Sequence, residues 1–310
     1  MNQKQKENIN NMLTSKKIFR DPLSNHTSFG IGGPAECIIY PDNQEELSKI
    51  LKYTNREQIS IFFLGSGSNV LVWDDGFEGI VISLRKTFKK LTINNDCLIT
   101  SESGVMLGTL VKEAIRNNIN GLESLIGVPG TLGGALIMNA GAFGSEISNY
   151  FIQANTMTIN GKIKTYSKKQ IDFSYRSSSF PYNEILIEAK FKCKKGTPKK
   201  IQLDRKKASQ SRKTKQPLKF RSAGSIFKNP SNKLAAGYLI DKAGLKGTQI
   251  GDAYISKKHA NFIINTDQAT ANDVFNLILI AKKRVAEKFN INLELEVKLV
   301  GFPETMINKL

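Results

Sequence analysis

Residues Gly121–Gly144 read GLESLIGVPGTLGGALIMNAGAFG, a stretch with seven glycines, one proline and no charged residue after Glu123. Glycine in a helix interior costs about 1 kcal/mol relative to alanine, so this density argues against a regular helix. Glycine is instead favoured where the backbone takes a positive φ or approaches a ligand closely. The stretch predicts tight turns and short apolar segments against a large, flat and partly anionic ligand. A buried loop that binds nothing is the alternative.

The same uncharged run is long enough to span a bilayer. Its glycines, Pro129, Thr131 and Asn139 argue against a membrane helix, and the chain contains no second candidate span. The first residues are rich in Lys, Asn and Gln and lack the apolar core of a secretory signal. We therefore expect a soluble cytoplasmic protein with no membrane partner.

A second glycine-rich loop, Gly65-Ser-Gly-Ser-Asn69, follows an apolar run at Ile59–Leu64 and leads directly into another at Val70–Trp73. A Rossmann dinucleotide-binding turn requires Gly-x-Gly-x-x-Gly at the start of a helix, and the sixth residue here is Val70. The loop thus joins two strands. Consecutive Gly and Ser amides can form an anion-binding nest, although a plain hairpin turn fits the pattern as well. Two such loops in one chain favour a shared diphosphate ligand.

The composition bounds the class of protein. A chain of 310 residues with 40% apolar content can form two or three domains with buried cores. The formal net charge of +18 has three explanations: nucleic-acid binding, binding of small polyanions, or solvated background lysine. Nucleic acid is the least favoured, because the chain has no zinc-finger, RNP or K-homology signature. Three scattered cysteines and two histidines predict neither a disulfide framework nor a metal site; these are Cys37, Cys97, Cys193, His26 and His259.

The apolar periodicity predicts many short strands and a few helices, typical of an α+β chain. A capping box of Asp42 and Glu45 begins one helix, Asn160-Gly161 joins a hairpin, and Thr270 with Asp273 begins a long amphipathic helix that runs to about Phe289. The other predicted helices are one short helix within 1–20, Val105–Asn117, Asp204–Arg212 and Leu234–Ala243. The predicted strands are Glu36–Tyr40, Ile59–Leu64, Val70–Trp73, Gly79–Leu84, Leu91–Ile93, Cys97–Thr100, Ile152–Ile159, Ile163–Tyr166, Ile185–Cys193, Tyr254–Ser256, Asn261–Ile264 and Leu293–Val300.

Six segments in a fixed order carry a family resemblance: Leu64–Leu71, Gly127–Ala135 with Met138–Ala142, Ser174–Arg176, Ser222–Pro230, His259–Asn265 and Glu296–Gly301. Together they resemble UDP-N-acetylenolpyruvoylglucosamine reductases, the flavoenzymes of early peptidoglycan synthesis. The set spans nearly the whole chain and is far more specific than any one segment. Few residues separate Arg176 from the strand at Ile185, so the chain resembles the shorter subclass, which lacks an inserted tyrosine loop. Gly30 departs from the family, where a larger and often basic residue is expected.

The resemblance implies an α+β fold with a vanillyl-alcohol-oxidase-type (PCMH-like) FAD-binding region in two subdomains and a small α+β substrate-binding domain. The FAD-binding region is expected at residues 1–200, with subdomains at about 1–72 and 73–200 and with residues 298–310 returning to it. The substrate-binding domain is expected at 201–297. The implied reaction uses NADPH and noncovalent FAD to reduce the enolpyruvyl group of UDP-N-acetylglucosamine enolpyruvate to UDP-N-acetylmuramate. A monomer without a nucleic-acid partner is expected.

The resemblance also implies the site residues. FAD is expected to contact the two glycine-rich loops, at Gly65, Ser66, Gly67, Ser68, Asn69, Ile126, Gly127, Pro129, Gly130, Thr131, Gly133, Gly134, Asn139, Ala140 and Gly141. The substrate is expected at Lys215, Asn229 and Tyr175. The catalytic residues are expected to be Arg176, Ser225 and Glu296, and no metal is expected.

The chemistry of an enol ether explains those catalytic residue types. Hydride addition to one carbon leaves negative charge on the neighbouring carbon and its carboxylate, so the site needs a fixed cation and a proton donor. Arg176 suits the carboxylate, Ser225 resembles the proton donor, and Glu296 matches the catalytic glutamate. By pattern alone, the three are a surface arginine, a turn serine and one of two solvent-facing glutamates, and alternation does not separate Glu296 from Glu294.

Two other functions stay open at this stage. One is a related FAD-dependent dehydrogenase or oxidase of another small acid, although the glycine-rich loops hold no Cys or His for covalent flavin attachment. The other is a basic nucleic-acid-binding protein, which would be colourless and would bind DNA or RNA with strong salt dependence.

Overall fold

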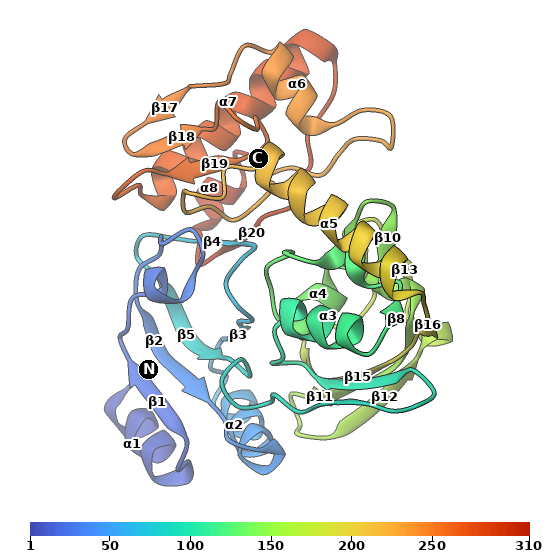
Figure 1. Cartoon of the computed structure of the whole chain (residues 1–310). Coiled ribbons are helices and arrows are strands. Elements are labelled where there is room, and N and C mark those ends of the chain that lie inside the picture. The colour runs from blue at the N-terminus through green and yellow to red at the C-terminus, as the bar shows by residue number, and fades with distance from the viewer. The chain divides into compact units, whose positions relative to one another are not determined.

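The structure is a computed structural model that describes all 310 residues of the chain (Figure 1). Its backbone forms two compact units, each assembled from segments that are separated in the sequence. Unit 1 contains residues 1–19, 36–66 and 79–212, and unit 2 contains residues 20–35, 67–78 and 213–310. This division differs from the predicted domain boundaries. Unit 1 ends within helix α5 (Pro198–Lys215), and residues 298–310 belong to unit 2.

Unit 1 contains two sheets. The four-stranded sheet has the order β1-β2-β5-β3, with β1 antiparallel to β2 and β3 parallel to β5. The five-stranded sheet has the order β12-β11-β15-β7-β6 and is antiparallel throughout. The bounds are β1 Lys16–Phe19, β2 Ala35–Tyr40, β3 Ile61–Phe63, β5 Phe77–Ile82, β6 Leu91–Ile93, β7 Leu98–Glu102, β11 Phe151–Thr158, β12 Ile163–Ser167 and β15 Glu184–Lys192. Apart from β1, which the sequence analysis did not predict, these strands confirm the predicted ones to within a few residues.

The central strand β15 is buried on both faces, which explains its continuous apolar run. Ile185 and Ile187 pack with helices α1 and α2, whereas Leu186 and Phe191 pack with α3 and α4 on the other side. The helices are α1 Gln3–Met12, α2 Gln44–Arg56, α3 Leu107–Arg116 and α4 Leu132–Ile137. The rest of unit 1 consists of short pairs and 3-10 turns, at β8 Ile119–Asn120, β16 Lys194–Lys195, β9 Gly141–Ala142, β10 Ser145–Glu146, β13 Phe173–Ser174, β14 Ser177–Ser178, η2 Glu123–Leu125, η3 Ile147–Asn149 and η4 Lys168–Gln170.

The predicted capping box of α2 is wrong by one residue. The N-cap is Asn43, whose side chain accepts the Glu46 N–H at 3.0 Å. The Glu46 carboxylate does not return to the cap, because it accepts four hydrogen bonds elsewhere. It binds the backbone N–H groups of Thr14, Ser15 and Asp42 and the Thr14 hydroxyl, at 2.8 to 3.1 Å.

Glu46 makes the stability of unit 1 dependent on pH. Burial of this carboxyl raises its pKa, but the four hydrogen bonds more than offset that effect and lower the pKa to about 2. A lowered folded-state pKa stabilises the protein above the unfolded-state value, and the stabilisation is lost as the pH falls from 4.5 towards 2.

We therefore expect Glu46→Gln to lower the free energy of unfolding by about 3 kcal/mol at pH 7, and by progressively less as the pH falls below 4.5. Urea unfolding of both proteins between pH 7 and pH 3 measures this difference. Glu45→Gln, on the exposed side of the same turn, is the control and should change stability little at any pH. A Glu46→Gln effect that stays constant with pH would contradict the assignment.

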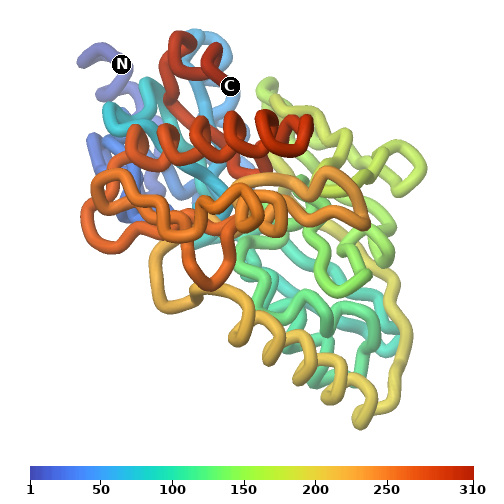
Figure 2. The backbone as a smooth tube through the Cα atoms, turned by 90° about the horizontal axis from the view of Figure 1, so that it is seen from above, coloured from blue at the N-terminus to red at the C-terminus, as the bar shows by residue number.

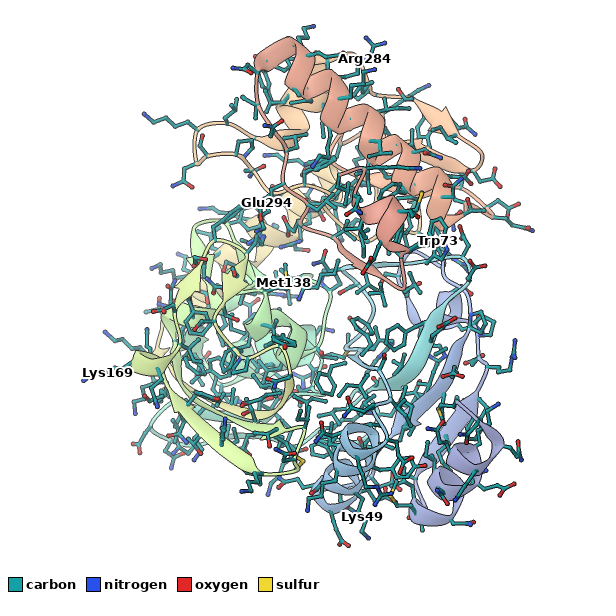
Figure 3. The ribbon with its side chains drawn as sticks, turned by 180° about the vertical axis from the view of Figure 1, so that it is seen from behind. Lys49, Trp73, Met138, Lys169, Arg284 and Glu294 are labelled. Carbon is teal, nitrogen blue, oxygen red and sulfur yellow. The ribbon has the colours of Figure 1, made fainter.

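Unit 2 is organised around helix α7 (Ala271–Phe289), which Figure 2 shows as one long uninterrupted helix. Its buried face packs with helix α6 and with the three-stranded antiparallel sheet β17-β18-β19. A parallel pair, β4 with β20, completes the unit. The bounds are η1 Leu23–His26, β4 Val70–Val72, α6 Ala236–Lys242, β17 Gln249–Ile250, β18 Ala253–Ile255, β19 Ile263–Asn265, β20 Lys298–Val300 and α8 Glu304–Ile307. Trp73, labelled in Figure 3, follows β4 and packs on Phe302 with ring centroids 4.8 Å apart.

The capping box predicted for α7 is confirmed. The Thr270 hydroxyl accepts the Asp273 N–H at 3.0 Å, and the Asp273 carboxylate accepts the Thr270 N–H at 2.9 Å. The Asp74 carboxylate adds two further bonds, from the N–H groups of Ala271 and Asn272 at 2.7 and 3.0 Å. The segment after β4 is thus fixed to the first turn of α7.

Two predicted elements differ from the structure. The predicted strand Leu293–Val300 is regular only at β20, because residues 293–297 bond the Ser222–Pro230 segment through single bridges and loop contacts. The glycine-rich stretch contains the short helix α4, which its glycine density argued against. Glycine is favoured at residue 133 because α4 packs closely on Ser103: a Cβ at this position would lie only 3.1 Å from the Ser103 Cβ. None of the helices combines the length and the hydrophobicity that crossing a bilayer requires.

Candidate functional site

In unit 1 the two glycine-rich segments come into contact. A Cβ on Gly65 would lie 2.7 Å from the Thr131 Oγ1, so the first loop packs directly against the second. Thr131 is buried and forms the N-cap of α4, where its hydroxyl accepts the Gly134 N–H at 3.5 Å. Gly127 and Gly130 have φ values of +76° and +135°, which L side chains rarely adopt. The glycines at these positions are therefore required by the backbone.

The amino end of α4 is not an open anion nest. The N–H groups of Leu132 and Gly133 donate to the carbonyls of Val105 and Ser103, at 2.8 and 2.9 Å. Any phosphate contact in unit 1 therefore needs donors other than these amides.

Asn139, predicted to bind the cofactor, is fully buried and has a φ of +43°. Its Nδ2 donates to the Glu146 carboxylate at 2.8 Å and to the Ser174 carbonyl at 3.0 Å, and its Oδ1 accepts the Ser148 N–H at 3.4 Å. The amide thereby ties the end of the glycine-rich stretch to Ser174, the residue that precedes Tyr175 and Arg176. This side chain positions other parts of the site.

Two tight hairpins lie beside that amide. The β13–β14 hairpin carries Tyr175 and Arg176 at its turn, where Arg176 has a φ of +57°. The Arg176 guanidinium lies over the Tyr175 ring, with Cζ 5.0 Å from the ring centroid. A Cβ on Gly141 would lie 3.4 Å from the Arg176 Nη1, so the β9–β10 hairpin and Arg176 are neighbours. The structure thus brings Arg176 and Tyr175 to the carboxyl end of the glycine-rich stretch.

In unit 2, the second half of the first loop lies against the segment that contains η1. A Cβ on Gly67 would lie 2.1 Å from the His26 carbonyl oxygen, and the Gly67 carbonyl accepts the Ser28 N–H at 2.9 Å. Gly67 also has a φ of +67°. The Asn69 amide donates to the Glu296 carbonyl at 3.0 Å, which connects this loop to a predicted catalytic residue.

Unit 2 also brings Ser225 and Glu296 together. The Glu296 N–H donates to the Ile226 carbonyl at 2.8 Å, so Glu296 lies beside the residue that follows Ser225. The buried Asn261 holds the same segment from the other side, through its backbone carbonyl to the Ile226 N–H and through its side chain to the backbone of Phe227. Both predicted residues are half-buried on this braced backbone.

The structure separates Glu296 from Glu294, which the sequence pattern does not. Glu294, labelled in Figure 3, has a side chain 73% exposed and forms an ion pair with Lys228 at 2.5 Å. Glu296 is half-buried. Glu294 thus pairs with Lys228 at the surface, whereas Glu296 is the less exposed glutamate and bonds Ile226, the residue after Ser225.

The predicted substrate residues of unit 2 take different positions. Asn229 is exposed, and its Oδ1 accepts the N–H of Ala236 at the start of α6 at 3.0 Å. Lys215 is exposed at the end of α5. Burial, Lys246 and Lys215 together lower the pKa of His259, whose Nδ1 lies 3.3 Å from the Asn261 N–H. A neutral His259 that accepts this bond has a structural role.

The departure at Gly30 has a structural explanation. Gly30 has a φ of +65°, and a Cβ there would lie 2.6 Å from the Arg221 Nη1. The Arg221 side chain therefore occupies the space beside residue 30. Arg221, the residue before the Ser222–Pro230 segment, therefore brings a basic group next to residue 30.

A flavin dinucleotide fits these residues. In unit 1, a Cβ on Gly65 would lie 2.7 Å from the Thr131 Oγ1, and a Cβ on Gly127 would lie 3.3 Å from the Arg212 Cδ, so the glycines let these segments pack closely around the start of α4. Unit 1 also contains Arg212, a residue that no motif indicated, whose buried Nε has no hydrogen-bond partner. A buried cationic donor of this kind suits an anionic ligand.

Comparisons with known proteins point to one family. Residues 35–167 match the family model for an FAD binding domain, and residues 216–300 match that for the UDP-N-acetylenolpyruvoylglucosamine reductase C-terminal domain. The chain is 38% identical over 297 residues to UDP-N-acetylenolpyruvoylglucosamine reductase 2 of Bacillus cereus, covering 95% of this chain and 96% of the relative. It is 40% identical over 294 residues to the Clostridium tetani reductase, covering 94% and 95%.

A solved structure agrees with these sequence matches. The crystal structure of UDP-N-acetylenolpyruvylglucosamine reductase (MurB) from Thermus caldophilus aligns with a TM-score of 0.78 at 34% identity, over 93% of this chain and 99% of the other. The α+β fold class with a flavin-binding region, predicted from the sequence, is confirmed.

Proposed function

The chain belongs to the UDP-N-acetylenolpyruvoylglucosamine reductase family, and we propose that Ser225 supplies the proton, Arg176 binds the substrate carboxylate and Glu296 assists proton transfer in the family's reaction. The protein is an FAD-binding oxidoreductase that uses NADPH and acts on a UDP-sugar in peptidoglycan precursor synthesis. The reaction converts the enolpyruvyl group of UDP-N-acetylglucosamine enolpyruvate to the lactyl group of UDP-N-acetylmuramate.

The observation that supports the roles of Ser225 and Glu296 most strongly is the set of hydrogen bonds that holds the Ser225 segment in unit 2. The Ile226 carbonyl accepts the Glu296 N–H at 2.8 Å, and the Glu296 carbonyl in turn accepts the Asn69 amide at 3.0 Å. The backbone next to Ser225, the backbone of Glu296 and the Asn69 side chain are therefore joined by hydrogen bonds. Such an arrangement holds a catalytic group in place through its neighbours.

Bound FAD supplies the hydride, which it takes from NADPH. Arg176 is suited to the substrate carboxylate, since a guanidinium binds a carboxylate through two parallel hydrogen bonds and stays charged. A contact of this kind contributes about 1.5–3 kcal/mol. The Ser225 hydroxyl then gives its proton to the carbon that carries the developing negative charge. Glu296 would orient a water or share a proton with that hydroxyl, because an isolated serine hydroxyl is a weak acid.

The proposal extends to the predicted binding residues. Tyr175, stacked under Arg176, would line the substrate, and Lys215 and Asn229 would lie at its diphosphate. We further propose that the enzyme is a monomer and works in the cytoplasm. Size-exclusion chromatography with light scattering tests the first point, and fractionation of cells tests the second.

Purified protein tests the function directly. We expect it to be yellow, to release FAD on denaturation without covalent attachment, and to oxidise NADPH over many turnovers only when the enolpyruvyl UDP-sugar is present to reoxidise the flavin. The product, identified by mass spectrometry, should be heavier than the substrate by two hydrogens. Yellow protein that leaves this substrate unchanged would favour a related dehydrogenase or oxidase of another small acid. Colourless protein with salt-dependent DNA or RNA binding would favour a nucleic-acid-binding function.

A further inference from the structure

The first part of helix α5 carries a high concentration of positive charge. Residues 194–207, which lead into the helix and form its first turns, contain seven Lys or Arg and one Asp. Their net charge of +6 is one third of the +18 of the whole chain, in 14 of its 310 residues. All seven cationic side chains are exposed; they are Lys194, Lys195, Lys199, Lys200, Arg205, Lys206 and Lys207. An even background of lysine does not explain this concentration.

The helix packs on unit 1 through one narrow face. Of its 18 residues only Ile201 and Ala208 are buried, and both belong to the apolar core of unit 1. At roughly 100° per residue, Leu203 lies about 200° around the helix from Ile201 and so faces solvent. Its side chain is 51% exposed. Figure 2 shows α5, in gold, along the outside of unit 1. The opposite side of α5 is therefore an open surface.

Four lysines surround Leu203 on this open surface. They stand three and four residues before and after it in the helix, so their side chains lie beside it on the same side. None of the four takes part in an ion pair. The one acidic residue, Asp204, is turned about 100° from Leu203 around the helix. This lysine face consists of Lys199, Lys200, Leu203, Lys206 and Lys207.

We propose that the lysine face binds the surface of an anionic lipid bilayer, with the ammonium groups at the lipid phosphates and the Leu203 side chain at the headgroup boundary. Clusters of four to eight Lys or Arg on a helix bind anionic lipids, and each cation contributes about fivefold to the partition. A leucine among the cations adds apolar contact in the interface. Lysine side chains can lay their methylene stems along that layer while the charge stays in water.

The residue types favour lipid over other polyanions. Protein–protein interfaces are depleted in lysine and enriched in arginine and aromatic residues, whereas four lysines form this face. Proteins that bind single-stranded nucleic acid stack bases on aromatic side chains, and residues 194–207 contain none. A sheet of mobile lipid phosphates needs only point charges, which lysine supplies. The contact requires no membrane-spanning segment, so the expectation of no membrane partner, which rested on the lack of such segments, does not cover it.

The test measures how the purified full-length protein sediments with lipid vesicles. We expect it to bind vesicles of phosphatidylcholine that contain phosphatidylglycerol, and not vesicles of phosphatidylcholine alone. High salt should release it, because the Debye length falls from about 10 Å at 0.1 M to about 3 Å at 1 M. A fourfold variant should bind roughly 10²–10³-fold more weakly, at about fivefold per cation. Its substitutions are Lys199→Gln, Lys200→Gln, Lys206→Gln and Lys207→Gln.

Leu203→Gln separates a lipid surface from a purely ionic partner. A side chain that enters the headgroup boundary loses contact with water, so this variant should bind the anionic vesicles about three- to tenfold more weakly. The four lysines remain, so the dependence of binding on salt should match that of the wild type. Unchanged affinity in Leu203→Gln would contradict the contact of this side chain with lipid.

A second fourfold variant removes the same charge from other exposed positions of unit 1 and should bind the vesicles nearly as the wild type does. Its substitutions are Lys89→Gln, Lys90→Gln, Lys168→Gln and Lys169→Gln. Both fourfold variants should unfold in urea close to the wild-type midpoint, because all eight side chains are exposed. The proposal is wrong if the wild type does not distinguish anionic from neutral vesicles, or if the two fourfold variants lose binding equally. RNA binding that is tighter than vesicle binding and that needs the lysine face would also overturn it.

Vesicle binding and catalysis are tested independently. None of the substituted residues is a predicted catalytic, cofactor or substrate residue, so every variant should reduce the enolpyruvyl UDP-sugar in solution at the wild-type rate. If the wild-type protein binds vesicles but does not reduce the UDP-sugar, only the proposed function fails. If it is active and ignores the vesicles, only the membrane contact fails.

Discussion

Ser225→Ala should slow reduction of the enolpyruvyl UDP-sugar by roughly 10²–10⁴-fold while FAD reduction by NADPH proceeds at the wild-type rate. The second step needs a proton at carbon, and alanine has none to give. The first step transfers hydride to the cofactor and does not use this hydroxyl. The segment should remain folded, because its fixed points are the backbone groups of Ile226 and Phe227 and the buried Asn261.

Stopped-flow absorbance of the flavin measures both steps separately. The enzyme is first mixed with NADPH alone, and the reduced enzyme is then mixed with the UDP-sugar without oxygen. Ser222→Ala, three residues earlier in the same segment, is the matched control and should leave both rates near wild type. Equal slowing of the two steps in the Ser225→Ala enzyme would show that Ser225 is not the proton donor.

Gly67→Ala should cost the protein its FAD, since the added methyl group has no space. Its Cβ would lie 2.1 Å from the His26 carbonyl oxygen and 2.8 Å from the Thr27 Cα, and backbone atoms cannot move aside as a flexible side chain can. The φ of +67° adds about 1–2 kcal/mol of strain for any L residue. With an overpacking cost of about 1–3 kcal/mol, the total loss of stability should be roughly 2–5 kcal/mol.

Gly244→Ala isolates the steric part of that effect. Gly244 is also in unit 2 and has a φ of +78°, but no atom lies within 4 Å of its added Cβ. It should lose only the strain of about 1–2 kcal/mol and should retain FAD. The flavin-to-protein absorbance ratio and the urea midpoint of each purified variant measure the two effects. If both variants retained FAD equally, the close packing of the loop on His26 would have no part in cofactor binding.

Local patterns predicted most elements because they act over a few residues. The Asn160-Gly161 turn joins β11 to β12 with Gly161 at a φ of +70°, and Thr270 with Asp273 forms the capping box of α7. The cap of α2 was misplaced because its Glu46 bonds Thr14 and Ser15, residues that no local pattern connects to it. Helix α4 was missed because Gly133 and Gly134 have low helix propensity. The reason for a glycine at residue 133 is the close packing of α4 on Ser103, a tertiary contact that a local sequence pattern does not contain.

The residues of the candidate site likewise fall into those that the sequence indicated and one that only the folded structure shows. Ser225, Arg176 and Glu296 stand in recognisable segments, so the sequence indicated them, although it could not separate Glu296 from Glu294 without their burial. Arg212 stands in a helix rich in lysine and arginine, and nothing in that run distinguishes it from its exposed neighbours. Only its position over Gly127 and its unsatisfied Nε mark it, and both depend on the folded chain.

The pairing of β4 with β20 has a consequence for the order in which a newly made chain can fold. Val70–Val72 directly follow the Gly65–Asn69 loop, yet their strand partner is Lys298–Val300, near the end of the chain. During synthesis the loop therefore leaves the ribosome long before its partner strand does. The hydrogen bond from the Asn69 amide to the Glu296 carbonyl can form only after residue 296 has been made. A nascent chain that stops before residue 298 lacks the β20 strand, so the loop that is expected to bind the cofactor is fully supported only when translation is nearly finished.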